Sequence, residues 1–296
     1  MRTPTFPEPP RSDDAEEEGV AAPAPPPPLE ETIRALRQGP VRATDVARLS
    51  DLGREDGRLL AREWPTLPEA TRVAIVRAMD ELAEERVELT FGRALRVALD
   101  DEAAAVRQLA VAALWEDERE DLLERMLDLV ERDPSQDVQA AAARGLGRFA
   151  ERAAAGDLDE AVARRLRSTL AALAEDETVP YGVRRGALEA VGVFGREERV
   201  GELIRDAYEG DDEGLRASAL YAMGRSLDTG WFGTLIDELQ SPEAELRYEA
   251  ARACGTLGDD RAVPELGQAA RDGDVEVRQA AIEEALTVAE PVRGER

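Results

Sequence analysis

The sequence predicts an all-α protein in which pairs of helices stack into a solenoid. Ala, Leu, Glu and Arg dominate the composition and aromatic residues make up only 4%, so residues that favour helices far outnumber those that favour sheets. The decapeptide LRYEAARACG at 246–255 is a near repeat of LRASALYAMG at 215–224. Self-similarity at a spacing of about 30 residues is the signature of a repeat array, and we expect about six to eight helix pairs.

Residues 1–28 are predicted to be a disordered, acidic, Pro-rich tail. They contain nine of the 17 prolines, end in APAPPPP, and carry six acids against two arginines. Pro-rich acidic sequence cannot bury a core and resists helix formation. The polyproline stretch is also a candidate ligand for an aromatic groove in another protein.

Residues 29–296 are predicted to form the solenoid, and its first segments have clear helix ends. LEETIRALRQG ends at Gly39, which Pro40 follows, and TDVARLSDLG ends at Gly53. Gly is the preferred residue directly after a helix, and Pro cannot continue one. The expected organisation is degenerate capping helices at 29–64, repeats at 65–289, and a frayed C-terminus at 290–296.

The helices of the repeats begin with comparable signals. LPEATRVAIVRAMDELAEE opens near Pro68, and SPEAELRYEAARACGTLG opens with Ser241 and Pro242. Pro is tolerated in the first turn because the N–H that it lacks would have no partner there, and Ser is a preferred N-cap. We therefore predict that Ser241 caps a helix whose first residue is Pro242.

Six copies of the decapeptide share one register. The reference position is Arg107, Gln139, Arg184, Arg216, Arg247 and Arg278 in chain order. In every copy the preceding residue is aliphatic, the third residue after it is Ala, and the seventh is apolar or small. Residues four apart lie along one helical face. We expect that face to be buried, with Ala allowing a neighbouring helix to approach closely.

The spacing in residues between two of the copies is longer than the other spacings. The sequence between Gln139 and Arg184 holds an insertion at 150–178. We expect it to lengthen a loop and the first helix of a pair, and so to alter the curvature of the solenoid or add a lip to a binding face.

The repeats resemble the HEAT family, in particular the short HEAT-like repeats also found in phycobilisome-type bilin lyases. The resemblance is carried by the VR..A...LG-like helices and by an Asp six residues before the reference position in three copies. It covers 65–289 well and 29–64 loosely. It implies a right-handed solenoid whose second helices line the concave surface. It also implies an Asp–Arg ladder between repeats, with Asp101, Arg107, Asp133, Arg184, Arg216, Arg247, Asp272 and Arg278 as its members.

The composition excludes several kinds of chemistry. The chain has no His and no Lys, so it has no imidazole base, no His-ligated metal, no Schiff-base lysine and no P-loop. The single Cys254 falls at a core offset and is expected to be a small buried hydrophobe. The acidic turns at 208–214 and 271–277 lack the ligand spacing of an EF-hand. We expect neither a catalytic site nor a cofactor or metal.

The charge restricts the partners. A formal net charge of -26 disfavours nucleic acid and anionic membranes, which require clustered positive charge. The start of the chain lacks the pattern of a signal peptide, and no apolar run is long enough for a membrane span. The expected location is the cytoplasm. The negative field favours protein or peptide partners with basic patches.

Offsets +1 and +5 of the second helices lie off the buried face and are the candidate binding positions. Glu249 is added because the copy at 246–255 differs from the other copies there. The candidates are Arg144, Arg185, Glu189, Tyr221, Tyr248, Glu249 and Arg252. Tyr and Arg are enriched at binding hot spots. The leading hypothesis is a non-catalytic scaffold or adaptor that binds a partner in this groove.

Three alternatives stay open from the sequence. In the first, the tyrosines pack over the ridge between helices and bind nothing. In the second, the protein handles a chromophore as bilin lyases do. In the third, it is an assembly subunit of a larger complex. The oligomeric state is not determined by the sequence. Among other HEAT-like enzymes, iron hydroxylases need His, which this chain lacks, and DNA glycosylases need a basic groove.

Overall fold

The computed structural model describes residues 28–289. The tail predicted for residues 1–28, except Pro28, and the frayed end predicted for 290–296 lie outside the described residues. Within 28–289 the chain is made of α-helices and short 3-10 turns, without a strand. The prediction of an all-α solenoid of stacked helix pairs is confirmed.

The helices fall into an inner and an outer layer after an N-terminal group of α1 (Leu29–Gln38), α2 (Ala43–Val46) and α3 (Arg54–Glu63). The inner layer consists of α4 (Glu69–Glu85), α6 (Ala104–Ala113), α8 (Gln136–Gly145), α11 (Tyr181–Val191), α13 (Glu213–Arg225), α15 (Ala244–Leu257) and α17 (Val275–Ala289). The outer layer consists of α5 (Gly92–Ala98), α7 (Glu120–Arg132), α10 (Glu160–Glu175), α12 (Glu198–Glu209), α14 (Phe232–Glu238) and α16 (Val263–Ala269).

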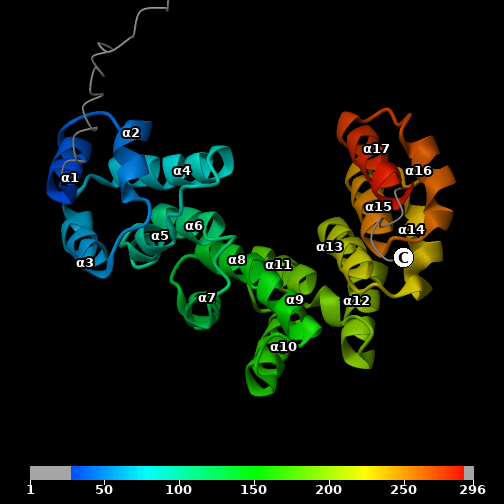
Figure 1. The fold of residues 1–296 in the computed structure, drawn as a ribbon. Helices are drawn as coiled ribbons and strands as arrows, with labels where there is room; N and C mark the ends of the chain where they lie inside the picture. Colours follow the sequence, from blue (N-terminus) through cyan, green and yellow to red (C-terminus); the bar gives the residue numbers. More distant parts are fainter. Residues whose placement is uncertain (1–27, 290–296) are drawn as a thin grey trace, which may run out of the picture.

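The solenoid is curved into an arch (Figure 1). Each inner helix packs on the next inner helix along the chain and on the outer helix that precedes it. The inner helices α13, α15 and α17 face the open side of the arch, whereas α14 and α16 lie on its outside (Figure 1). The long step between Gln139 and Arg184 contains an additional helix, α9 (Gly147–Ala155), before α10.

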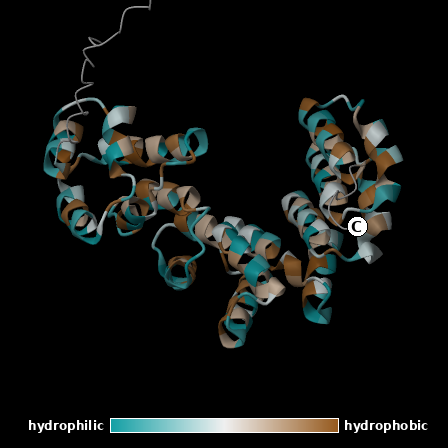
Figure 2. Ribbon diagram, in the orientation of Figure 1, coloured by the Kyte–Doolittle hydropathy of each residue, from teal (hydrophilic) through white to brown (hydrophobic). Residues whose placement is uncertain are grey.

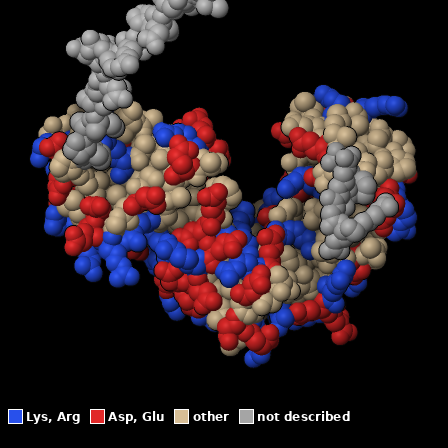
Figure 3. Space-filling view, viewed as in Figure 1, with Lys and Arg blue, Asp and Glu red and all other residues tan. Residues whose placement is uncertain are grey.

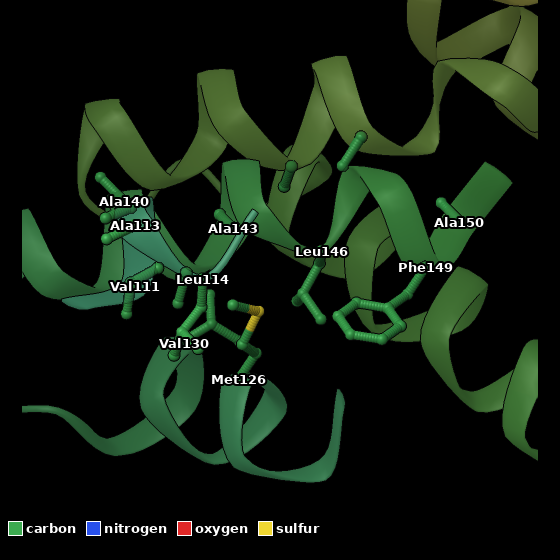
Figure 4. Close-up of a cluster of buried hydrophobic side chains, with 14 of the residues drawn as sticks. Val111, Ala113, Leu114, Met126, Val130, Ala140, Ala143, Leu146, Phe149 and Ala150 are labelled. Carbon is green, nitrogen blue, oxygen red and sulfur yellow. The ribbon is translucent and has the colours of Figure 1, made fainter. Parts of the chain in front are cut away.

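The core is a continuous apolar band between the two layers. Hydrophobic residues gather on the helix faces that are turned toward neighbouring helices (Figure 2). In Figure 4, Met126 of α7 lies close to Leu146 and Phe149 at the junction of α8 and α9. All three side chains are fully buried. The offsets -1 and +3 of the repeat are buried in the same way, as at Val106 and Ala110.

One predicted helix start is wrong. Helix α15 begins at Ala244 with Glu243 at the N-cap position, so Ser241 and Pro242 precede it. The physical reason is the Arg247 guanidinium, which donates hydrogen bonds to the carbonyls of Ser241 at 2.8 Å and Pro242 at 3.0 Å. These carbonyls are held in a turn and cannot start the helix.

Candidate functional site

The concave side of the arch holds a polar hollow of about 270 Å³, which we call the inner hollow. Its lining residues are Arg144, Gly147, Arg185, Glu189, Ala190, Ala217, Ser218, Tyr221, Arg225, Glu249 and Arg252. Six of the seven candidate binding residues therefore meet in one cavity. They come from α8, α11, α13 and α15, four successive inner helices.

The register of the repeat explains why these side chains converge. Arg185 and Glu189 are four residues apart on α11, and Tyr221 and Arg225 are four apart on α13, so each pair lies on one helical face. The opposite face of each helix carries the buried Ala and aliphatic offsets. The inner helices stack in the same orientation, so their exposed faces, which carry these charged and aromatic residues, lie side by side on the concave surface.

Ser218 connects two charged side chains in the inner hollow. Arg185 Nε donates to Ser218 Oγ at 2.9 Å, and Ser218 Oγ donates to Glu189 Oε1 at 2.7 Å. Arg185 Nη2 also lies 3.3 Å from Glu245 Oε1 at the rim. The Arg185 guanidinium is thus fixed from two sides, and the Glu189 carboxylate already accepts a hydrogen bond.

Tyr221 lies among guanidinium groups. The Cζ atoms of Arg252 and Arg225 lie 5.4 Å and 5.6 Å from the centroid of its ring, which is cation–π distance. Arg225 Nη1 donates to the Tyr221 hydroxyl at 3.2 Å, and Arg225 Nη2 lies 2.9 Å from Glu151 Oε1. The Tyr221 oxygen accepts from Arg225, so its own proton remains available for an acceptor in the cavity.

The two remaining arginines of the hollow are less engaged. Arg144 is exposed and has no hydrogen bond or ion pair to any other residue in the range 28–289. Arg252 Nη1 reaches Glu249 Oε2 only at 3.4 Å, and its side chain is 40% exposed. Burial raises the pKa of Glu249, and the nearby Glu189 and Glu245 add to that rise against the opposite effect of Arg252 and Arg185.

Tyr248 is the candidate that the structure places elsewhere. It borders a second cavity of about 360 Å³ with Arg252, Glu276, Gln279, Ala280, Glu283 and Glu284, which we call the adjacent hollow. Arg252 separates the two, since its Cζ atom lies 5.6 Å from the Tyr248 ring. Tyr248 is half-buried and packs against the core. The adjacent hollow is lined by three glutamates and one arginine and is therefore negative.

Sequence reasoning missed Ser218 and Arg225 as members of the inner hollow. A signal for Arg225 was available, because it lies one helical turn after Tyr221. Ser218 had no such signal: it is buried and reaches the cavity only because α11 and α13 pack closely.

The predicted ladder exists in two places. Arg107 of α6 donates to both carboxylate oxygens of Asp133 at 2.7 Å and 2.8 Å, and Arg247 of α15 donates to Asp272 at 2.7 Å and 3.0 Å. In both cases the aspartate belongs to the turn of the following repeat. Asp101 takes the same role one repeat earlier, where its Oδ2 lies 2.9 Å from Arg72 Nε.

The ladder does not run through Arg184, Arg216 and Arg278, which corrects the prediction. The turns of the following repeats carry Gly210 and Ser241 at the equivalent position, so they offer no aspartate to Arg184 or Arg216. Arg216 pairs instead with Glu238 Oε1 at 3.0 Å. Arg278, in the last described repeat, binds backbone carbonyls of its own turn, among them that of Asp272 at 2.7 Å.

Residues 233–292 match the family model described as HEAT repeats. The complex of CpcE and CpcF of phycocyanin lyase from Nostoc sp. PCC7120 has 21% identity, 92% coverage of both chains and a TM-score of 0.55. This similarity shows a HEAT-like fold for the chain as a whole.

Two further solved structures are more distant. YibA of Escherichia coli is 18% identical over 87% of this chain and 92% of that chain, with a TM-score of 0.44. Human deoxyhypusine hydroxylase in complex with glycerol is 16% identical over 88% and 96%, with a TM-score of 0.37. No curated protein matches the sequence at a significant level.

The solenoid places the thiol of Cys254 in its interior. Cys254 is buried in α15, and burial raises its pKa to about 12, so the thiolate that acts as a nucleophile is not populated at neutral pH. Among residues 28–289 there is no metal-binding group of three or more Cys, Asp or Glu side chains. No helix in the same range is long and apolar enough to cross a membrane.

Proposed function

We propose that this HEAT solenoid is a non-catalytic scaffold or adaptor that binds a protein or peptide in the groove formed by its inner helices. One observation carries the proposal: four successive inner helices each contribute charged or aromatic side chains to a single cavity on the concave surface. Stacked repeats present extended concave surfaces that suit elongated partners. The cavity of about 270 Å³ is smaller than typical small-molecule sites and suits one or two side chains of a partner.

The composition of the hollow supports binding more than catalysis. Tyr221, Arg225 and Arg252 form an amphipathic, cationic surface of the kind found at binding hot spots. Glu189 accepts from the Ser218 hydroxyl, but Ser218 is buried and its oxygen also accepts from Arg185, so the pair bridges two helices and does not present an accessible nucleophile.

Selection from a random peptide library against the full chain tests the proposal. We expect selected peptides to bind wild type, and Tyr221→Ala to weaken that binding by about 2 kcal/mol, roughly thirtyfold. The control is Arg199→Ala, which removes an exposed ion pair with Glu175 on the outer layer and should leave the affinity unchanged. Peptides that bind both variants as tightly as wild type would rule out the groove.

Assembly into a larger complex is a second candidate function. It is favoured by the fold shared with CpcE and CpcF, which are described as a complex with each other, and by the exposed Ile282 and Leu286 on α17. Light scattering with size-exclusion chromatography tests self-association of this chain. Chromophore handling is tested by incubation with a bilin: an unchanged absorbance spectrum argues against it.

A further inference from the structure

We infer that the inner hollow takes an acidic side chain, so that the partner of this strongly acidic protein presents an extended acidic peptide segment there. The inference rests on the proposed scaffold function and specifies its ligand. Three groups in one cavity of about 270 Å³ carry it: Arg144, which has no ion pair with any of residues 28–289, the weakly paired Arg252, and the Tyr221 hydroxyl.

The first step is an account of donors and acceptors. In the inner hollow Glu189 accepts from Ser218 at 2.7 Å, and Glu249 faces Arg252 at 3.4 Å. The donors with spare capacity are the guanidinium of Arg144, most of that of Arg252, and the Tyr221 proton. A ligand that complements this set has to bring acceptor oxygens and negative charge.

The second step is preorganisation. Arg185 and Arg225 are held in place by Glu245 and Glu151 at the rim. Arg225 in turn donates to the Tyr221 oxygen at 3.2 Å, which leaves the phenol proton free for an incoming acceptor. The Tyr221 hydroxyl is thus oriented before binding, which lowers the ordering cost of the complex.

The third step concerns charge. The cavity lining contains four arginines and two glutamates, in a chain whose formal net charge is -26. Basic side chains are visible in the depth of the hollow between the two arms of the arch (Figure 3). The rim carboxylates of Glu245 and Glu151 offset Arg185 and Arg225, so the cations left to attract an acidic ligand are Arg144 and Arg252, which line the cavity. Net charge alone predicts a partner with basic patches. Such a partner is complementary to the outside of the arch and to the adjacent hollow, but not to the inner hollow.

The fourth step is size. A cavity of this volume holds a side chain such as Glu or Asp but not a folded domain. The concave groove continues past Arg252 into the adjacent hollow with its Glu276 and Glu283. That continuation is negative, so the acidic segment is expected to lie over the inner hollow, with one carboxylate inside it, and not to extend beside Glu276 and Glu283.

Fluorescence anisotropy with the full chain and three labelled peptides tests the inference: a Glu-Ala repeat and its Gln-Ala and Lys-Ala counterparts. We expect the Glu-Ala peptide to bind at least about tenfold more tightly than the other two. Arg252→Gln and Arg144→Gln should each weaken it about tenfold, and added salt should weaken it further. Glu276→Gln in the adjacent hollow is the matched control and should leave the affinity equal or raise it, because it removes a nearby negative charge.

Four results would overturn the inference. The first two are equal affinity for the Glu-Ala and Gln-Ala peptides, and tighter binding of the Lys-Ala peptide. The third is that the Arg144→Gln and Arg252→Gln variants bind the Glu-Ala peptide as tightly as the Glu276→Gln variant does. The fourth is displacement of the peptide by inorganic phosphate at equal concentration, which would indicate a small-anion site. If library peptides bind in a Tyr221-dependent manner while the Glu-Ala peptide does not, the scaffold function stands and the acidic segment is wrong. If neither binds, both are wrong.

Discussion

Gly224 of α13 lies directly against the backbone of Ala253 in α15. A Cβ atom added to Gly224 would lie 2.7 Å from the Cα of Ala253, which is closer than two non-bonded carbon atoms approach in protein structures. Gly192, directly after the end of α11, stands in the same relation to Ala222 of α13, also at 2.7 Å. The glycine at offset +8 of one repeat therefore fits onto the alanine at offset +6 of the next, and this contact sets the spacing of the inner helices.

Replacing this glycine should destabilise the solenoid. We expect Gly224→Ala to lower the free energy of unfolding by about 1–3 kcal/mol, because the methyl group overpacks a contact between two backbones. Urea denaturation followed by circular dichroism measures it. The matched control is Gly147→Ala, whose added Cβ would lie 3.8 Å from Ala190, an ordinary contact distance. An equal effect of both substitutions would show that close approach at offset +8 is not what the glycine provides.

The buried ladder pair should contribute more than an exposed pair. The side chains of Asp133 and Arg107 are 3% and 10% exposed. Asp133→Ala leaves the Arg107 guanidinium buried without a carboxylate and should cost about 3 kcal/mol of unfolding free energy. Asp121→Ala removes an exposed partner of Arg96 and should cost at most about 1 kcal/mol. A cost for Asp133→Ala as small as that of the control contradicts the structural role of the ladder.

The ladder should also make stability depend on pH in the acid range. The hydrogen bonds from Arg247, together with that from the Asp274 N–H, lower the pKa of Asp272 in the folded state. A lowered carboxyl pKa stabilises the fold fully above the unfolded value of about 3.9, and this stabilisation is lost as the pH falls through the lower folded value.

The advantage of wild type over Asp272→Asn in unfolding free energy should therefore be constant above about pH 5 and shrink below about pH 4. Urea titrations at a series of pH values measure it. An advantage that grows on acidification would have the wrong sign for a lowered pKa.

Cys254 should resist modification in the folded protein. Burial keeps its pKa at about 12, so at pH 8 the thiolate is scarce and reagent has no access. We expect labelling with a thiol-specific reagent to be slow in buffer and fast in urea, where the thiol takes its ordinary pKa. A native rate near that of the unfolded chain would place Cys254 at an accessible surface.

The two tyrosines should differ in their effect on peptide binding. Tyr221 lines the inner hollow, whereas Tyr248 borders the adjacent hollow and packs against the core. We expect Tyr248→Ala to weaken binding of a selected peptide less than Tyr221→Ala does, and to lower the unfolding free energy. Calorimetric titration and urea denaturation of both variants separate the effects. Stronger loss of binding from Tyr248→Ala would move the binding site toward α17.

The sequence by itself determined the class of fold, the repeat register and the buried face. Offsets such as Val106 and Ala110 are buried because the helical period alone assigns them to one side of each inner helix. The ladder was predicted only in part: pairs form where the next turn carries Asp133 or Asp272, but the prediction also included Arg184 and Arg216, whose next turns carry Gly210 and Ser241.

Only the tertiary structure decided which exposed side chains share a cavity. Periodicity fixes the direction of a side chain around its own helix, but contacts between helices depend on how closely and at what angle those helices pack. This is why Ser218 enters the inner hollow and Tyr248 leaves it. It is also why a chain with a net charge of -26 has a cavity rich in arginine: net charge is a sum over all residues, whereas a site depends on the few that stacking brings together.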